Sequence, residues 1–184
     1  MRYTVMHVGG PVQDLAAAIA EHRRFGVGPW SVTEPREFRT YDHAAGREVT
    51  QRLSMAFGRL PGGGAVELVG AGDDPHRGPQ WQLLQRGAAL THVAYWCPDV
   101  PAAIRDLVAG GATIETLPVA PGVAPASLGE RISAARTAYL LLPSGLRVEL
   151  VDAGLWGAPL RALCGAGIDA VLDPPSTPEG MFHG

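Results

Sequence analysis

The sequence has little cysteine, no long apolar run and no leader-like start. Its two cysteines, Cys97 and Cys164, lie far apart and form no Cys-x-x-Cys pair, so we expect reduced thiols and a cytoplasmic location. The longest apolar stretches, such as residues 139–142, are far too short to cross a bilayer, so no membrane partner is expected. No charged segment followed by an apolar one precedes the first strand-like residues, and we therefore expect no signal peptide.

A basic patch is also missing. The net charge is −3, and no stripe of basic residues interleaved with aromatic ones runs along the chain, so a nucleic acid is not an expected partner. Apolar residues make up 46% of the 184 positions and charged residues 18%, which is the composition of a globular protein. This length suffices for one sizeable core, or for two small modules that share one.

What the chain does contain is an internal repeat. Three dipeptides return at a constant offset of 85 residues: His7-Val8, Asp14-Leu15 and Ala18-Ile19 return as His92-Val93, Asp99-Val100 and Ala103-Ile104. Glu67 and Glu149 repeat at nearly the same offset, 82 residues. A repeat of this kind indicates two similar modules. Each contributes one imidazole and one carboxylate, and modules packed face to face would bring all four groups around one divalent metal ion.

Both halves predict the same order of elements, strand-helix-strand-strand-strand. In the first half we expect a strand at about 2–8, a helix capped by Asp14 that ends near 25, an extended segment at 30–38, a charged loop at 39–47, and strands at 49–59 and 65–69. In the second half we expect a strand at 90–97, a helix at 101–109, a strand at 113–117, a long loop at 119–134, and strands at 136–142 and 146–151.

These elements predict an α+β fold with four parts. They are a first βαβββ module at 1–69, a connector at 70–89 with a short helix near 81–84, a second βαβββ module at 90–152, and a C-terminal tail at 153–184. The tail is expected to form one or two helical turns near 158–163. Beyond Asp173 its proline-rich sequence favours an extended or disordered end.

Alternation along each strand assigns a face to each of the four polar residues. The expected same-face neighbours are Tyr3 and Val5 for His7, Ala65 and Val69 for Glu67, Ala94 and Trp96 for His92, and Arg147 and Val151 for Glu149. Met6 and Val8 are expected to face away from His7. A carboxylate inside an apolar strand is costly to bury unless it is paired or bound to a metal. A single histidine is more often an ordinary core or surface residue, but two matched pairs favour a metal site.

With this repeat and ligand set, residues 3–152 resemble the vicinal oxygen chelate superfamily, which includes glyoxalase I, methylmalonyl-CoA epimerase, extradiol dioxygenases and bleomycin-resistance proteins. The similarity is greatest to the glyoxalase and epimerase branch, in His7-Val8, Phe25-Gly-Val-Gly-Pro-Trp30, Val66-Glu-Leu68, Thr91-His-Val93 and Val148-Glu-Leu150. The resemblance implies that the two modules form an open, curved mixed sheet around a metal-binding cleft. It also implies a small-molecule substrate and a homodimer.

Two imidazoles and two carboxylates make a neutral site for one divalent ion: Co, Mn, Ni, Zn, Fe(II) or Mg. The expected ligands are His7, Glu67, His92 and Glu149. An octahedral ion would keep two positions for a substrate with adjacent oxygens, and it would favour loss of a proton next to a carbonyl. A carboxylate would serve as the base. The resemblance to glyoxalase I implies Glu149 or Glu67 in that role, whereas the resemblance to the epimerase implies Glu48, with Gln51 as the alternative in a shifted register.

Five residues are predicted to line an apolar substrate pocket. They are Trp96 on the ligand face, Arg147 beside Glu149, and Gln51, Met55 and Phe57 along one face of the strand at 49–59. Arg147 would neutralise an anionic substrate group, although a surface ion pair is the alternative. The stripe of Met55 and Phe57 fits a core equally well. The loop at 119–134, with Arg131, is either a lid or a plain surface loop.

The predicted function is that of a metal-dependent isomerase, epimerase or glyoxalase-type lyase. An Fe(II) extradiol-type dioxygenase needs only two histidines and one carboxylate, so a fourth ligand argues against that activity. Drug-sequestering binding proteins of this family lack a complete ligand set, so the intact set also argues against a non-enzymatic binding role.

Overall fold

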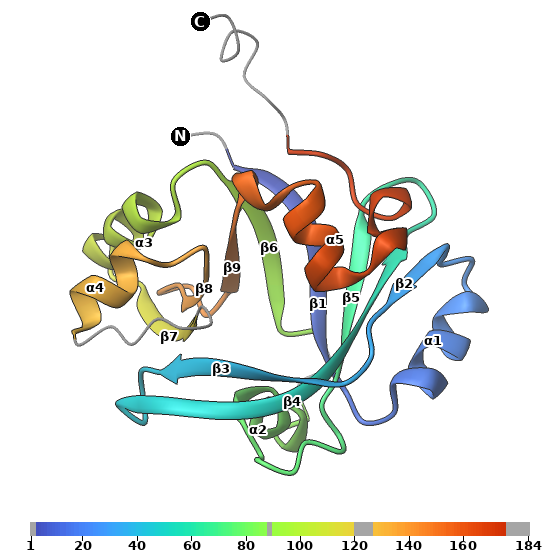
Figure 1. Cartoon of the computed structure of the whole chain (residues 1–184), viewed down its shortest axis with the longest axis horizontal. Coiled ribbons are helices and arrows are strands. Elements are labelled where there is room, and N and C mark those ends of the chain that lie inside the picture. The colour runs from blue at the N-terminus through green and yellow to red at the C-terminus, as the bar shows by residue number, and fades with distance from the viewer. Residues whose placement is uncertain (1–2, 88–89, 120–126, 176–184) are drawn as a thin grey trace, which may run out of the picture.

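The computed structural model describes residues 3–87, 90–119 and 127–175. Its elements in chain order are β1 (Thr4–Val12), α1 (Leu15–Arg23), β2 (Trp30–Val32), β3 (Arg36–Asp42), β4 (Arg47–Arg59), β5 (Ala65–Gly70), α2 (Pro79–Gln85), β6 (His92–Cys97), α3 (Val100–Ala109), β7 (Thr113–Pro118), α4 (Leu128–Ser133), β8 (Thr137–Leu141), β9 (Arg147–Asp152), the 3₁₀ helix η1 (Ala153–Leu155), α5 (Ala158–Cys164) and the 3₁₀ helix η2 (Ala166–Ala170). The nine strands of these residues form one curved, mixed sheet (Figure 1), which confirms the predicted α+β class.

The repeat is visible in the strand pairing. β1 runs parallel to β5 with Gly9 opposite Glu67, and β6 runs parallel to β9 in the equivalent register. The two halves meet through β1 and β6, which are antiparallel, with His7 opposite Ala94 and Gly9 opposite His92. This pairing relates the halves by an approximate two-fold axis. Both histidines therefore lie at the seam between the modules.

The outer strands of the two halves also pair, and this closes the sheet into a barrel. Thr40, Tyr41 and Asp42 of β3 lie opposite Pro118, Leu117 and Thr116 of β7. The hydrogen-bonded circuit runs β4-β3-β7-β8-β9-β6-β1-β5 and returns to β4. The resemblance implied an open sheet. The circuit closes here because β3 continues through Asp42, into residues predicted to form a charged loop.

Helices α1 and α3 cover the outer face of the barrel (Figure 1). Asp14 caps α1 as predicted, by accepting a hydrogen bond from the backbone of Ala17, and Asp99 caps α3 at the equivalent position of the repeat. The apolar residues that alternate with Glu67 and Glu149 face these helices. The inner face is left to the candidate ligands.

One predicted face is wrong, and a β-bulge explains the difference. The register of β1 against β6 shifts by one residue between Val5 and His7, so Met6 is the extra residue. Val5 is 55% exposed, whereas Met6 and His7 are both buried. Tyr3 packs edge-on against Tyr95, which faces the outer core. Met6, and not Tyr3 or Val5, therefore shares the inner face with His7.

The C-terminal residues differ most from the prediction. The expected tail contains η1, α5 and η2, which fold back into the curve of the sheet (orange to red in Figure 1). Gly157 and Gly165 flank α5 with φ values of 90° and 91°, which side-chain-bearing residues rarely adopt. Most of the predicted extended end beyond Asp173 lies outside the described residues, as does part of the loop at 119–134. The described part of that loop carries α4, which begins with a capping box at Ser127.

No helix in the described ranges combines the length and apolarity that a membrane crossing requires.

Candidate metal centre

The four side chains predicted as ligands meet on the inner face of the barrel. Nε2 of His7 lies 3.3 Å from Nε2 of His92, 3.4 Å from Oε2 of Glu67 and 3.2 Å from Oε2 of Glu149. Nε2 of His92 lies 3.3 and 3.5 Å from the same two oxygens. One donor atom from each residue lies within 4.8 Å of the other three. Two strands of each module thus bring one imidazole and one carboxylate apiece to a common point.

This cluster is shut off from solvent. His7 and His92 are each 2% exposed, Glu67 is 4% exposed and Glu149 is 7% exposed. Within the described part of the chain, Oε2 of Glu67 and Oε2 of Glu149 have no hydrogen-bond partner. Burying a carboxylate oxygen without a partner is costly, so lone pairs that converge in this way fit a cation between them.

The charges of the cluster depend on one another. Burial by itself lowers the pKa of His7, but the carboxylates of Glu67 and Glu149 outweigh burial and raise this pKa to about 9. Burial by itself would raise the pKa of Glu67, but His7 and His92 hold it well below its usual range. A proton on His7 therefore takes the place that a metal ion would occupy.

Thr91 holds the histidine of the second module. Its hydroxyl donates to the backbone carbonyl of Gly9 at 3.2 Å and lies 3.1 Å from Nδ1 of His92. Because the hydroxyl proton is directed at Gly9, the oxygen is free to accept from Nδ1–H of His92. That tautomer leaves the Nε2 lone pair of His92 facing the cluster, as a metal ligand requires.

Tyr139 is a site residue that the sequence predictions missed. Its ring packs edge-on against His92 with centroids 5.3 Å apart, and its hydroxyl pairs with Glu149. Burial, together with the charges of Glu149 and Glu67, raises the pKa of Tyr139 well above 10, so the hydroxyl stays protonated and donates. The repeat carried a signal for it, because Tyr139 follows the predicted site residue Phe57 by 82 residues, the offset that relates the two glutamates.

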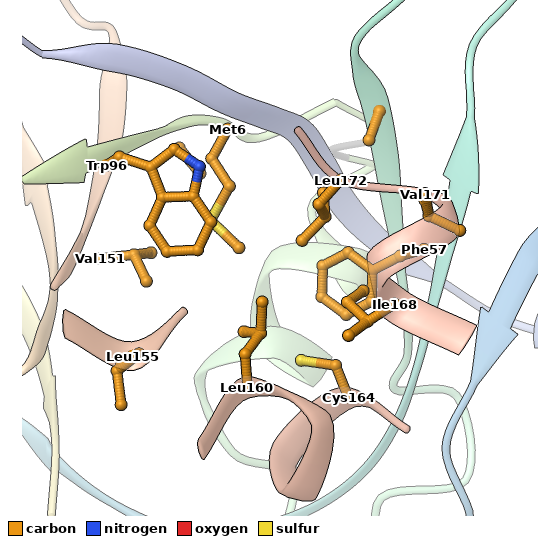
Figure 2. Close-up of a cluster of buried hydrophobic side chains, with 12 residues drawn as sticks. Met6, Phe57, Trp96, Val151, Leu155, Leu160, Cys164, Ile168, Val171 and Leu172 are labelled. Atoms are coloured by element: carbon orange, nitrogen blue, oxygen red, sulfur yellow. The ribbon is translucent and has the colours of Figure 1, made fainter. Parts of the chain in front are cut away.

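The C-terminal segment covers one end of the inner face (Figure 2). Its buried side chains, Leu155, Leu160, Cys164, Ile168, Val171 and Leu172, form one cluster with Met6, Phe57, Ala65, Ala94, Trp96 and Val151. Trp96 is 2% exposed, lies edge-on to Trp156 and donates its indole N–H to the carbonyl of Asp173. Trp96, Met55 and Phe57 were predicted to line the substrate pocket, and here they contact the protein's own chain.

The size of this contact distinguishes a wall from a lid. Six buried apolar side chains, at about 1.5–3 kcal/mol each, contribute on the order of 10 kcal/mol. That figure is comparable to the stability of an entire domain. A segment held so strongly does not open during each catalytic cycle, so residues 153–172 are a fixed part of the site.

Gln51 lies on the inner face of β4 but is not brought to the four ligands. Its amide nitrogen donates to the Thr40 hydroxyl at 3.4 Å, and its amide oxygen accepts from the backbone of Gln80 at 3.3 Å. These contacts attach the start of α2 to β4. Gln51 therefore closes the barrel beside α2.

Glu48 lies far from the ligands and is already paired. It precedes Phe57, which touches His7, by nine residues of continuous strand, or roughly 30 Å of chain. Its carboxylate accepts from Arg131 at 2.7 Å and from Arg39, and these two arginines hold its pKa below the usual range. Arg131 is thereby attached to β4 and does not point to the ligand cluster.

Arg147 shares the inner face with Glu149, as predicted, but its guanidinium is engaged. It forms a two-pronged ion pair with Glu115, in which Nη2 lies 2.7 Å from Oε1, and it donates to the carbonyl of Thr91 at 3.3 Å. These contacts match the alternative interpretation of Arg147 as a member of an ion pair. They also brace the backbone of Thr91, which precedes His92.

Comparison with known protein families places this architecture. The sequence model of the Glyoxalase/Bleomycin resistance protein/Dioxygenase superfamily matches residues 6–128. The chain belongs to this superfamily. The match contains His7, Glu67 and His92, whereas Glu149, Tyr139 and the C-terminal segment follow it in the chain. No curated protein matches the sequence.

Solved structures share the superfamily fold at low sequence identity. A hypothetical protein, BH1468 from Bacillus halodurans C-125, is 15% identical with a TM-score of 0.53, and the match covers 83% of this chain and 95% of that one. A methylmalonyl-CoA epimerase from Mycobacterium tuberculosis is 20% identical with a TM-score of 0.48, and the match covers 86% and 91%. A Streptomyces coelicolor methylmalonyl-CoA epimerase in complex with 2-nitronate-propionyl-CoA is 18% identical with a TM-score of 0.46, and the match covers 81% and 93%. The first of these supports the fold and nothing further.

The donor set of this superfamily member fits a small divalent cation. Five of the six separations among the two Nε2 and two Oε2 atoms are 3.2–3.5 Å. Four corners about 3.4 Å apart lie about 2.1 Å from a common centre, which is the bond length of Zn²⁺ to histidine nitrogen or carboxylate oxygen. Nitrogen and oxygen donors of this kind suit Zn, Mn, Co, Ni and Fe(II).

Proposed function

We propose that this superfamily member binds one divalent metal ion through His7, Glu67, His92 and Glu149. We further propose that it removes a proton next to a carbonyl group, as an isomerase, an epimerase or a glyoxalase-type lyase. The proposal rests on one observation: two buried carboxylate oxygens, one from each module, have no hydrogen-bond partner in the described residues and lie 3.2–3.5 Å from two histidine nitrogens.

A metal ion at this point would act as a Lewis acid toward a substrate with two adjacent oxygens. The chain supplies the surroundings in which such chemistry is effective. The four ligands are nearly inaccessible to water, and apolar side chains of the C-terminal segment close one end of the inner face. Charges interact more strongly in a dry, preorganised site than in water.

The base in this proposal is one of the two ligand carboxylates, Glu67 or Glu149. Either would need to give up its place in the cluster to accept the proton. Glu48 is the weaker candidate, because two arginines already neutralise its carboxylate and lower its pKa. A carboxylate held in that way is a poor proton acceptor near neutral pH.

Metal analysis of protein purified without chelator tests the first half of the proposal. We expect one equivalent of a divalent ion per chain, and its loss when His92 is replaced by alanine. His76→Ala is the matched control, because His76 is an exposed histidine whose side chain pairs with Glu37. Wild-type protein that holds no metal, and takes none up when metal is added, contradicts the proposal.

Solvent deuterium exchange tests the second half. Candidate thioesters and 2-oxo compounds with an acidic α-hydrogen should gain deuterium in the presence of the metal-loaded protein. Oxygen uptake with a catechol and Fe(II) would point instead to a dioxygenase. Metal binding with neither exchange nor oxygen uptake would favour a small-molecule-binding protein.

The homodimer and the cytoplasmic location remain predictions. Analytical ultracentrifugation should give the mass of two chains, and fractionation of the producing cells should place the protein with the cytoplasmic contents. A single-chain mass at micromolar concentration would contradict the dimer.

A further inference from the structure

The two modules differ in the residues that support their ligands, although they match in the ligands themselves. Thr91, which precedes His92, corresponds to Met6, which precedes His7, at the repeat offset of 85. Tyr139 corresponds to Phe57 at the offset of 82. At both positions the second module has a hydroxyl where the first has an apolar side chain.

The first difference concerns the two histidines. Nδ1 of His92 is paired with the Thr91 hydroxyl at 3.1 Å. Nδ1 of His7 is buried and has no hydrogen-bond partner in the described residues. Met6 occupies the equivalent place but offers no hydroxyl, and it packs into the apolar cluster instead. The tautomer of His92 is thus fixed by a neighbour, whereas that of His7 is not.

The second difference concerns the two carboxylates. Phe57 lies opposite Glu67 in the β4–β5 pairing, and Tyr139 lies opposite Glu149 in the β8–β9 pairing. Each ring packs edge-on against the histidine of its own module, with centroid distances of 5.4 Å and 5.3 Å. The rings are therefore equivalent in place, and they differ by one hydroxyl, which pairs with Glu149. Glu67 contacts only the two histidines among polar side chains of the described residues.

We propose that this asymmetry assigns different roles to the two carboxylates: Glu149 stays in place as a metal ligand, and Glu67 leaves the cluster to act as the base. The inference rests on the proposed function and goes further by naming the carboxylate that moves. Tyr139 and Thr91 are positioning residues that hold the second module's ligands. Phe57 and Met6 leave Glu67 and His7 without such restraint.

The chemical step is then a proton transfer to Glu67. The C–H bond next to the carbonyl breaks, and the proton forms an O–H bond with the Glu67 carboxylate. The electron pair of the C–H bond moves into a carbon–carbon double bond while the carbonyl π electrons move onto the oxygen. The proton returns from Glu67 to carbon and completes an isomerisation, so no external oxidant or reductant is needed.

Replacement of each glutamate by glutamine gives a matched test, because both changes remove the same charge and keep the same shape. The readout is the dissociation constant of Co²⁺, measured by competition with a coloured chelator. We expect Glu149→Gln to weaken Co²⁺ binding at least tenfold more than Glu67→Gln. Glu67→Gln should retain the ion and lose α-proton exchange by at least a hundredfold. Equal losses of Co²⁺ binding, or a greater loss in Glu67→Gln, overturn the inference.

Moving the hydroxyl between the rings tests its cause. Tyr139→Phe should weaken Co²⁺ binding about tenfold, the usual effect of removing a residue that orients a ligand. In the double variant Tyr139→Phe with Phe57→Tyr, the hydroxyl faces Glu67, and Glu67→Gln should now weaken Co²⁺ binding more than Glu149→Gln does. Retention of the wild-type order in that background, with an unchanged circular dichroism spectrum and melting temperature, overturns the role of Tyr139.

The outcomes separate this inference from the proposed function. Wild-type protein that binds no Co²⁺ contradicts both. Wild-type protein that binds Co²⁺ and exchanges α-protons, with Glu67→Gln and Glu149→Gln equally impaired in Co²⁺ binding, leaves the proposed function standing and removes the division of roles.

Discussion

Among single residues, His7 links the metal site to pH most directly. Its pKa of about 9 means that it carries a proton at pH 7 when no ion is bound. A metal ligand needs the Nε2 lone pair, so ion binding must displace that proton. We expect release of close to one proton per ion at pH 7, and an apparent affinity that rises as pH increases toward about 9. Isothermal titration in two buffers with different ionisation enthalpies measures the release, and binding heats that do not depend on the buffer would contradict it.

The same pKa shift predicts how pH affects the metal-free protein. The pKa of His7 is raised on folding from about 6.5, so its stabilising contribution is fully present below pH 6.5. That contribution is lost as pH rises from about 6.5 to about 9. Urea titrations of chelator-treated protein across this window should show a fall in the free energy of unfolding. His7→Gln, which cannot take up the proton, should lack that fall.

Gly9 is the residue at which a single methyl group should damage the site. A Cβ at this position would lie 2.9 Å from Cβ of Glu67 and 3.0 Å from Nε2 of His92. The ligands or strand β1 must therefore shift in Gly9→Ala. We expect metal affinity to fall at least tenfold and stability to fall by about 1–3 kcal/mol, which is typical of overpacking. Gly129→Ala is the control, because a methyl there meets only Oγ of Ser127 at 4.0 Å.

For the secondary-structure elements, the C-terminal segment makes the clearest stability prediction. Ile168 of η2 is fully buried against the inner face, and its replacement by alanine should cost about 2–5 kcal/mol through lost burial and a residual cavity. Leu163 of α5 is 39% exposed, so Leu163→Ala should change stability by much less. Urea denaturation of the two variants compares the costs. Equal and small effects would contradict the description of this segment as a fixed wall.

How far the site could be predicted from the sequence depends on the range of the interactions that form it. Alternation within one strand placed Glu67, His92 and Glu149 on the correct face, because that property is local. The bulge at Met6 was missed because it depends on the register of β1 against a strand about 85 residues later. Trp96 was placed on the correct face, but the segment that covers it shows no local pattern that identifies its partner.

Across the whole molecule, the ion is expected to stabilise both modules together. The four donors come from β1, β5, β6 and β9, so the site exists only when the two halves are joined. Free metal at a thousand times its dissociation constant stabilises a folded protein by about 4 kcal/mol. At about 2–4 °C per kcal/mol for a chain of this size, the melting temperature should rise by roughly 8–16 °C. Calorimetry with and without metal measures the shift, and His92→Ala should show none.

The matched rings of Phe57 and Tyr139 have a consequence for how such a site can arise. Two identical half-length subunits, paired about the same axis, would receive every amino-acid replacement twice. A hydroxyl gained beside one carboxylate would also be gained beside the other, and both would be restrained alike. Covalent fusion of the halves removes this restriction. Only after fusion can mutation tether one carboxylate and leave its twin at liberty, which is a division of labour that no symmetrical pair of equal partners can reach.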